Sequence, residues 1–103
     1  RNSIRSFQEL SFISYSGTYP LTGRIDRLVQ LNENEWAVID YKSGKLRGSD
    51  LQMNIYRMAA ESLTKGTVKM YLYSMVTGEY TKPRYLSEKE VNEKILKYME
   101  DLS

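Results

Sequence analysis

The chain has 103 residues, 41% of them hydrophobic, which fits one domain with a modest core, and its net charge of +2 is too small to indicate nucleic-acid binding by itself. It contains no cysteine and no histidine, which excludes disulfides, thiolate zinc sites, cysteine-held iron–sulfur clusters and histidine-based catalysis within the chain. Any metal would need oxygen ligands, which favours hard ions such as magnesium, manganese or calcium.

The first half of the chain is predicted to form three strands. Residues 6–15 and 21–31 are rich in apolar side chains and read as the first two, separated by a short turn. Residues 36–42 form the third strand, and a polar turn before it joins the second and third strands into a hairpin. Strict alternation along the second strand would place Ile25 and Leu28 on opposite faces.

A helix is predicted next, from a cap at Ser49 or Asp50 to about Leu63, with Gly66 as its left-handed C-cap. Its apolar side is expected to comprise Leu51, Ile55, Met58, Ala59 and Ser62. A strand at 67–75 follows, in which apolar and polar or aromatic residues alternate.

The last quarter of the chain is predicted to be a short edge strand and a helix. Residues 79–86 form the strand, which Pro83 interrupts. Ser87 and Glu90 form a capping box for a helix over about 88–101. The expected apolar face of that helix comprises Val91, Ile95, Leu96 and Met99. The order β-β-β-α-β-(β)-α predicts an α/β fold with a mixed β-sheet flanked by helices.

The segment IDYK at 39–42 carries the residues of greatest chemical interest. Residues two apart in a strand share a face, so Asp40 and Lys42 are expected to project together while Tyr41 points away. An acid and a lysine are costly to place near a core. Taken alone, the segment fits an ordinary ion pair at a strand end better than it fits a catalytic site.

Asp26 favours the catalytic interpretation. It lies mid-strand in GRIDRL, and the hairpin register can bring it near Asp40. Two neighbouring carboxylates repel each other, and a divalent cation relieves that repulsion. With the backbone carbonyl of Tyr41 they would supply part of a magnesium site. Lys42 could then stabilise charge on the phosphorus or hold the attacking water during phosphodiester hydrolysis.

Two further groups of residues are weaker candidates. Gln52 and Tyr56 lie four apart on the predicted helix, where an amide and a phenol could orient the acids or contact DNA. For these two residues alone, a polar helix rim is the favoured interpretation. Four basic residues are candidate phosphate contacts: Arg24, Arg27, Lys45 and Arg47.

Three ordered motifs resemble those of the PD-(D/E)XK nucleases, and more narrowly those of their RecB-type exonuclease branch. The motifs are G-R-I-D at 23–26, I-D-Y-K-S-G-K at 39–45 and Q-M-N-I-Y at 52–56, and the resemblance covers about residues 5–75. It makes Asp26 and Asp40 metal ligands, Lys42 the catalytic lysine, and Gln52 and Tyr56 a supporting motif. Glu9, on the strand before the first motif, becomes a further candidate acid.

The resemblance also implies a fold and a function. The fold would be a restriction-endonuclease-like core that lacks its first helix, forming a single domain over 1–103 of a longer chain. The function would be that of a magnesium- or manganese-dependent deoxyribonuclease, an exonuclease of DNA recombination, repair or defence, without an iron–sulfur cluster. Its expected partners are DNA and a helicase domain in the same polypeptide or complex, in the cytoplasm and away from membranes.

Two other hypotheses remain open. One is a catalytically silent nuclease fold that binds DNA or a partner protein. The other is a small α/β domain whose charged residues form surface ion pairs.

Overall fold

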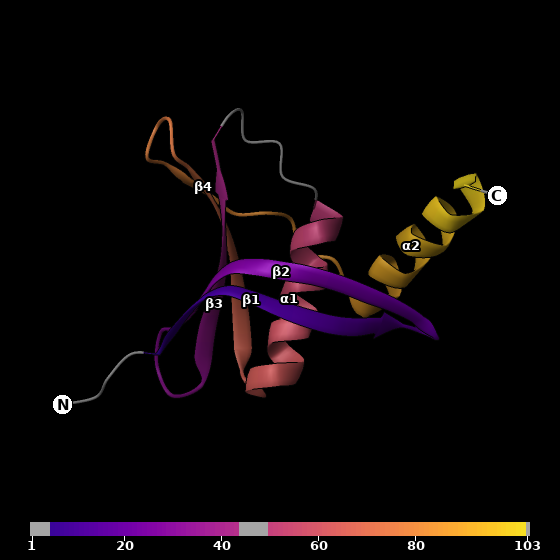
Figure 1. Cartoon of the computed structure of the whole chain (residues 1–103), viewed down its shortest axis with the longest axis horizontal. Helices are drawn as coiled ribbons and strands as arrows, with labels where there is room; N and C mark the ends of the chain where they lie inside the picture. Colours follow the sequence, from indigo (N-terminus) through magenta and orange to yellow (C-terminus); the bar gives the residue numbers. More distant parts are fainter. Residues whose placement is uncertain (1–4, 44–49, 103) are drawn as a thin grey trace.

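The computed structural model describes residues 5–43 and 50–102 (Figure 1). Its elements are β1 (Ser6–Ser16), β2 (Tyr19–Gln30), β3 (Glu35–Lys42), α1 (Asp50–Thr64), β4 (Thr67–Ser74), β5 (Tyr80–Thr81) and α2 (Glu88–Leu102). The strands lie side by side in chain order, with β3 and β4 parallel and the other neighbours antiparallel. The parallel pair requires the crossover that α1 provides, and the predicted mixed α/β sheet is confirmed.

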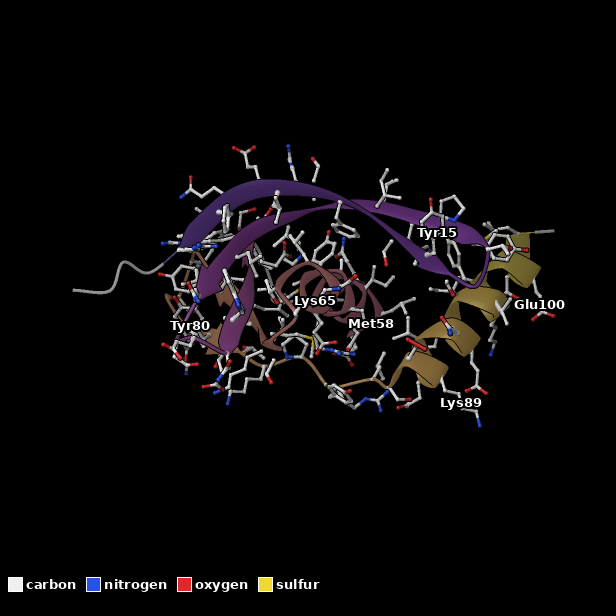
Figure 2. The ribbon with its side chains drawn as sticks, turned by 90° about the horizontal axis from the view of Figure 1, so that it is seen from below. Tyr15, Met58, Lys65, Tyr80, Lys89 and Glu100 are labelled. Carbon is white, nitrogen blue, oxygen red and sulfur yellow. The ribbon has the colours of Figure 1, made fainter. Side chains whose placement is uncertain are left out.

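The β1–β2 hairpin is irregular where Glu9 lies opposite Asp26. Glu9 has a left-handed φ of 51°, and the pairing of the two strands skips these two residues. Ile25 and Leu28 consequently pack in one core, so the predicted strict alternation is wrong at this point. Beyond the irregularity the hairpin arches over α1 (Figure 2).

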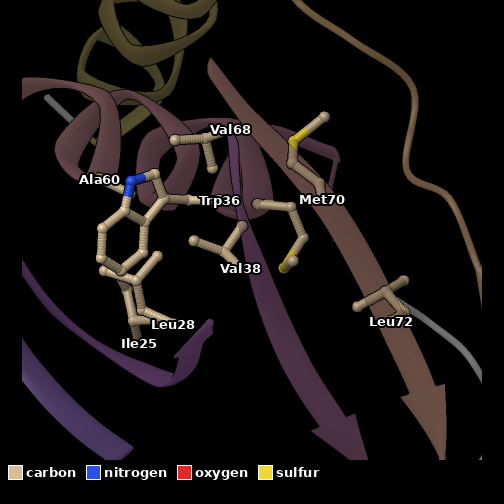
Figure 3. Packing of buried hydrophobic residues seen from close by; sticks show 9 residues of the cluster. Ile25, Leu28, Trp36, Val38, Ala60, Val68, Met70 and Leu72 are labelled. Carbon is tan, nitrogen blue, oxygen red and sulfur yellow. The ribbon is translucent and has the colours of Figure 1, made fainter. Parts of the chain in front are cut away.

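The main core lies between the sheet and α1 (Figure 3). Alternate residues of β3 and β4 point into it, from Trp36 and Val38 on one strand and from Val68, Met70 and Leu72 on the other. Ile25, Leu28, Met53 and Ala60 complete the cluster. Burial of a large apolar side chain contributes about 1.5–3 kcal/mol, so this cluster fixes the position of α1 under the sheet. The intervening residues of β3 and β4 face away from α1.

α1 buries two faces, and the predicted apolar side corresponds mainly to one of them. Met53 packs against the sheet, whereas Leu51, Ile55 and Met58 pack against the second core cluster, which α2 and Leu86 form. Ala59 of the predicted side is buried, but Ser62 is exposed. The sequence pattern of α1 does not show one apolar stripe, because the helix packs against the sheet in one direction and against α2 in another.

Asn54 and Arg57 are buried between these two faces of α1. The side-chain amide of Asn54 donates to the carbonyl of Arg84 at 2.8 Å and accepts from the N–H of Leu86 at 2.9 Å, and Arg57 donates to the carbonyl of Leu86 at 2.8 Å. Because the backbone at 84–86 bonds to α1 in place of β4, the predicted strand at 79–86 is reduced to β5.

The end of α1 differs from the prediction at one residue. Lys65, rather than Gly66, adopts the left-handed conformation, with a φ of 61°. Gly66 is required for a different reason, because a Cβ at this position would lie 2.7 Å from the carbonyl oxygen of Asn34.

α2 contacts the rest of the molecule through a narrow stripe. Val91 and Ile95 are buried in the second cluster, as predicted. Leu96 and Met99 are 51% and 37% exposed, so the predicted apolar face is too wide. No helix in the described part of the chain is long and apolar enough to cross a membrane.

The predicted capping box at the start of α2 is confirmed. The amide of Glu90 donates to Oγ of Ser87 at 3.2 Å, and the amide of Ser87 donates to Oε1 of Glu90 at 3.1 Å. The second bond lowers the pKa of Glu90 below its ordinary value because it favours the ionised carboxyl group.

Replacing Ser87 by alanine is expected to lower the free energy of unfolding by about 1 kcal/mol, because the amide of Glu90 loses its acceptor. Urea denaturation measures the change. Ser62→Ala is the matched control, since Ser62 is exposed inside α1 and alanine favours a helix there. Equal behaviour of the two variants would contradict a stabilising cap.

Candidate active site

The pairing between β2 and β3 stops where the two predicted acids lie. Its last pair joins Arg27 to Ile39, and the next residues in the same register are Asp26 and Asp40. Beyond this pair β2 leaves β3, and Oδ2 of Asp26 accepts the N–H of Tyr41 at 3.0 Å. The carboxylate replaces the backbone acceptor that the departing strand no longer offers. Asp26 is therefore held beside Asp40 by the backbone of β3.

Asp40 and Lys42 share the face of β3 that points towards α1, as the sequence predicts. Asp40 is 7% exposed, and Nζ of Lys42 lies 2.7 Å from its Oδ2. Burial raises the pKa of Asp40; the hydrogen bond from Lys42 opposes this shift, and the adjacent Asp26 carboxyl adds to it. The site thus gathers two acids and one lysine where ionising both acids is unfavourable without a further cation.

Gln52 and Tyr56 complete the site from α1. Nε2 of Gln52 donates to the phenol oxygen of Tyr56 at 2.8 Å, and the ring of Tyr56 packs edge-on against Phe12 at 5.6 Å between centroids. Burial raises the pKa of Tyr56, and the negative charges of Asp40 and Asp26 raise it further. The phenol therefore stays protonated at neutral pH and remains a hydrogen-bond donor near the acids.

Three of the weaker candidates are not brought to this site. Glu9 and Arg24 form a 3.4 Å ion pair with side chains 72% and 61% exposed, since the irregular pairing at Glu9 leaves its carboxylate in solvent. Arg27 lies on the opposite face of the sheet, where it donates to the phenol of Tyr41 at 3.4 Å. Lys45 and Arg47 lie outside the described residues.

The acids present are compatible with a hard divalent ion. Within residues 5–43 and 50–102, no group of three or more acidic side chains gathers at one place. Asp26 and Asp40 form a pair of partly desolvated carboxylates, and the backbone carbonyl of Tyr41 is the predicted third ligand. Magnesium typically binds through one or two carboxylates and completes its octahedron with waters and phosphate oxygens, so two acids suffice.

Two features near the site escaped the sequence interpretation. The amide of Met75 donates to the carbonyl of Lys42 at 2.8 Å, which fixes the β4–β5 turn beside the lysine. Tyr73 packs against Tyr41 at 5.8 Å between ring centroids. The alternation at 67–75 predicted which face of the sheet Tyr73 occupies. That Tyr41 is its neighbour depends on the parallel register of β3 and β4, which no local sequence pattern reveals.

Comparison with known proteins agrees with the fold. The solved structure described as "Crystal structure of SSO0001" matches with a TM-score of 0.62 at 14% sequence identity, over 95% of this chain and 51% of that one. This chain thus spans about half of that protein, and the likeness shows the restriction-endonuclease-like fold alone. A search of curated proteins finds no match. The model of the PD-(D/E)XK nuclease superfamily matches residues 2–103, and the chain therefore belongs to that superfamily.

Proposed function

We propose that this chain is a nuclease domain that hydrolyses DNA phosphodiester bonds at a site formed by Asp26, Asp40 and Lys42, with magnesium or manganese held by the two acids. The observation that carries the proposal is the convergence of two mutually repelling carboxyl groups and one ammonium at the end of β3. Membership of the superfamily supports nuclease activity. The metal and the DNA substrate rest on the chemistry of these residues and on the motif resemblance.

Each residue has a separate role in this proposal. Asp26 and Asp40 would hold the ion together with the carbonyl of Tyr41, and a bound ion lowers the pKa of water and neutralises charge on the phosphate. Lys42 carries its ammonium beside Asp40, where it can bind phosphate oxygens as negative charge builds on them. Tyr56, whose phenol accepts a hydrogen bond from Gln52, would orient the acids through its own hydroxyl hydrogen.

The biological setting is proposed from the motif resemblance. It favours an exonuclease of the RecB-type branch that acts in recombination, repair or defence inside the cell. A helicase domain in the same polypeptide or complex would supply the DNA.

Cleavage of end-labelled DNA in magnesium, manganese or EDTA tests the proposed activity. We expect products with either ion and none in EDTA, because the two acids cannot activate water alone. A catalytically silent domain would bind DNA in EDTA and cleave it in neither ion. That result would reject hydrolysis and favour the binding-module hypothesis, which gives no physical reason for keeping two mutually repelling carboxyl groups side by side.

A further inference from the structure

Four tyrosines form a continuous patch on the face of the sheet that points away from α1. Ring centroids lie 5.8 Å apart for Tyr41 and Tyr73, 4.7 Å for Tyr73 and Tyr80, and 6.0 Å for Tyr71 and Tyr80. The parallel register aligns Tyr41 with Tyr73, and the antiparallel register aligns Tyr73 with Tyr80. We name this patch, comprising Tyr41, Tyr71, Tyr73 and Tyr80, the tyrosine face.

Neither helix covers the tyrosine face in the part of the chain that the structure describes. α1 packs on the other side of β3 and β4, and α2 packs on α1. Tyr80 is 60% exposed and lies at the end of the molecule remote from α2 (Figure 2). Tyr41, Tyr71 and Tyr73 are half-buried, so part of each ring remains accessible beside Tyr80. A contiguous aromatic patch that solvent reaches is typical of a binding surface.

Two cationic side chains contact these rings. Arg27 donates to the phenol of Tyr41 at 3.4 Å, and Nζ of Lys82 lies 5.8 Å from the ring centroid of Tyr71. Glu35, at the start of β3, is paired with Lys69 at 3.4 Å. The chemistry of the patch therefore matches a ligand that combines flat aromatic groups with negative charge.

The tyrosine face is continuous with the proposed active site. Tyr41 stands between Asp40 and Lys42 in β3, so its ring lies on one face of the sheet while the acid and the lysine lie on the other. The turn at Met75 and Val76 extends past the end of β3, bonded to the carbonyl of Lys42. Both side chains of this turn are exposed, at 64% and 72%, and Oγ of Ser74 fixes its backbone.

We infer that the tyrosine face binds single-stranded nucleic acid, with bases stacked on the tyrosines and phosphates held by Arg27 and Lys82, and leads the strand around the end of β3 to Lys42. Base stacking on aromatic side chains needs unpaired bases, whose faces are open, whereas a duplex keeps them covered. The direction of the strand rests on the proposed function. Binding itself does not, since it requires neither metal nor the acids.

Fluorescence anisotropy with labelled oligo-dT in EDTA tests the inference without cleavage. Tyr80→Ala should weaken binding by about fivefold or more, the effect of losing one stacked base, while Tyr80→Phe should retain it. Lys82→Gln should lower both the affinity and its dependence on salt. Tyr98→Ala is the matched control, because Tyr98 is 62% exposed on α2. Duplex DNA should bind more weakly and respond little to Tyr80→Ala.

Wild-type affinity of Tyr80→Ala for oligo-dT would overturn the inference. So would self-association through this face, seen as a dimer in sedimentation that Tyr80→Ala dissociates while oligo-dT fails to bind. Failure of the proposed function is distinguishable from either result. Tyrosine-dependent binding without metal-dependent cleavage keeps the inference and rejects hydrolysis, whereas Asp40-dependent cleavage with normal binding by Tyr80→Ala does the reverse.

Discussion

Replacing Lys42 by methionine is expected to reduce DNA cleavage by about a hundredfold or more while the fold is kept. Methionine preserves the apolar stem of the side chain and removes the ammonium that lies 2.7 Å from Asp40. Loss of one preorganised group that stabilises transition-state charge typically lowers kcat by about 10²–10³-fold. Asp40→Ala should abolish cleavage, because it removes a proposed metal ligand.

The measurement is the initial cleavage rate in manganese at several DNA concentrations, which separates kcat from KM. Lys89→Met is the control, since Lys89 is an exposed lysine of α2, a helix that contributes no residue to the proposed site. A fall in kcat with unchanged KM is expected for Lys42→Met, because the ammonium acts on charge that develops during reaction. Wild-type kcat in Lys42→Met or in Asp40→Ala would exclude the proposed mechanism.

The convergence of Asp26 and Asp40 was predictable because a hairpin with a short turn fixes which residues face each other. Glu9, one strand away, was a candidate only through the motif resemblance, and pairing does not carry its side chain to the acids. Its left-handed backbone breaks the alternation on which any facing argument depends. Strand pairing therefore predicts which side chains face each other only where the backbone of both strands alternates regularly.

The elements themselves followed from their local patterns, but their partners did not. The alternation at 67–75 predicts β4 without indicating that Tyr73 meets Tyr41, because parallel pairing joins residues far apart in sequence. Asn54 and Arg57 look like surface residues of α1, yet both are buried by bonds to the backbone at 84–86. Tertiary contacts determine whether such polar residues are buried, and helix propensity does not predict those contacts.

Asp40→Asn is expected to stabilise the metal-free chain and to destabilise the chain in manganese relative to wild type. Without metal, burial and the neighbouring Asp26 carboxyl make the ionised form of Asp40 unfavourable, which is why its pKa is raised. Asparagine has nearly the same shape and no charge, and Lys42, which is partly exposed, can turn to solvent. With metal, the wild type gains binding energy that the variant lacks.

The metal-free effect should depend on pH with a definite sign. A carboxyl group whose pKa is higher in the folded state keeps its proton longer there, so wild-type stability falls as pH rises from the unfolded-state pKa through the folded one. The advantage of Asp40→Asn should therefore be full above the folded pKa and vanish in acid. Asp101→Asn, at an exposed position of α2, is the matched control for the same substitution away from the proposed site.

Thermal unfolding in EDTA and in manganese measures both halves of this prediction. An ion present at 100 times its Kd stabilises the wild type by about 2.7 kcal/mol, which raises the Tm of a domain of this size by about 10 °C or more. Asp40→Asn should show a higher Tm than wild type in EDTA and no rise with manganese. A lower Tm in EDTA would mean that the ion pair with Lys42 outweighs the repulsion. An equal rise in Tm with manganese in both proteins would place the metal elsewhere. A divalent ion that binds because it relieves the repulsion between two carboxylates must bind more weakly when one of them is neutralised.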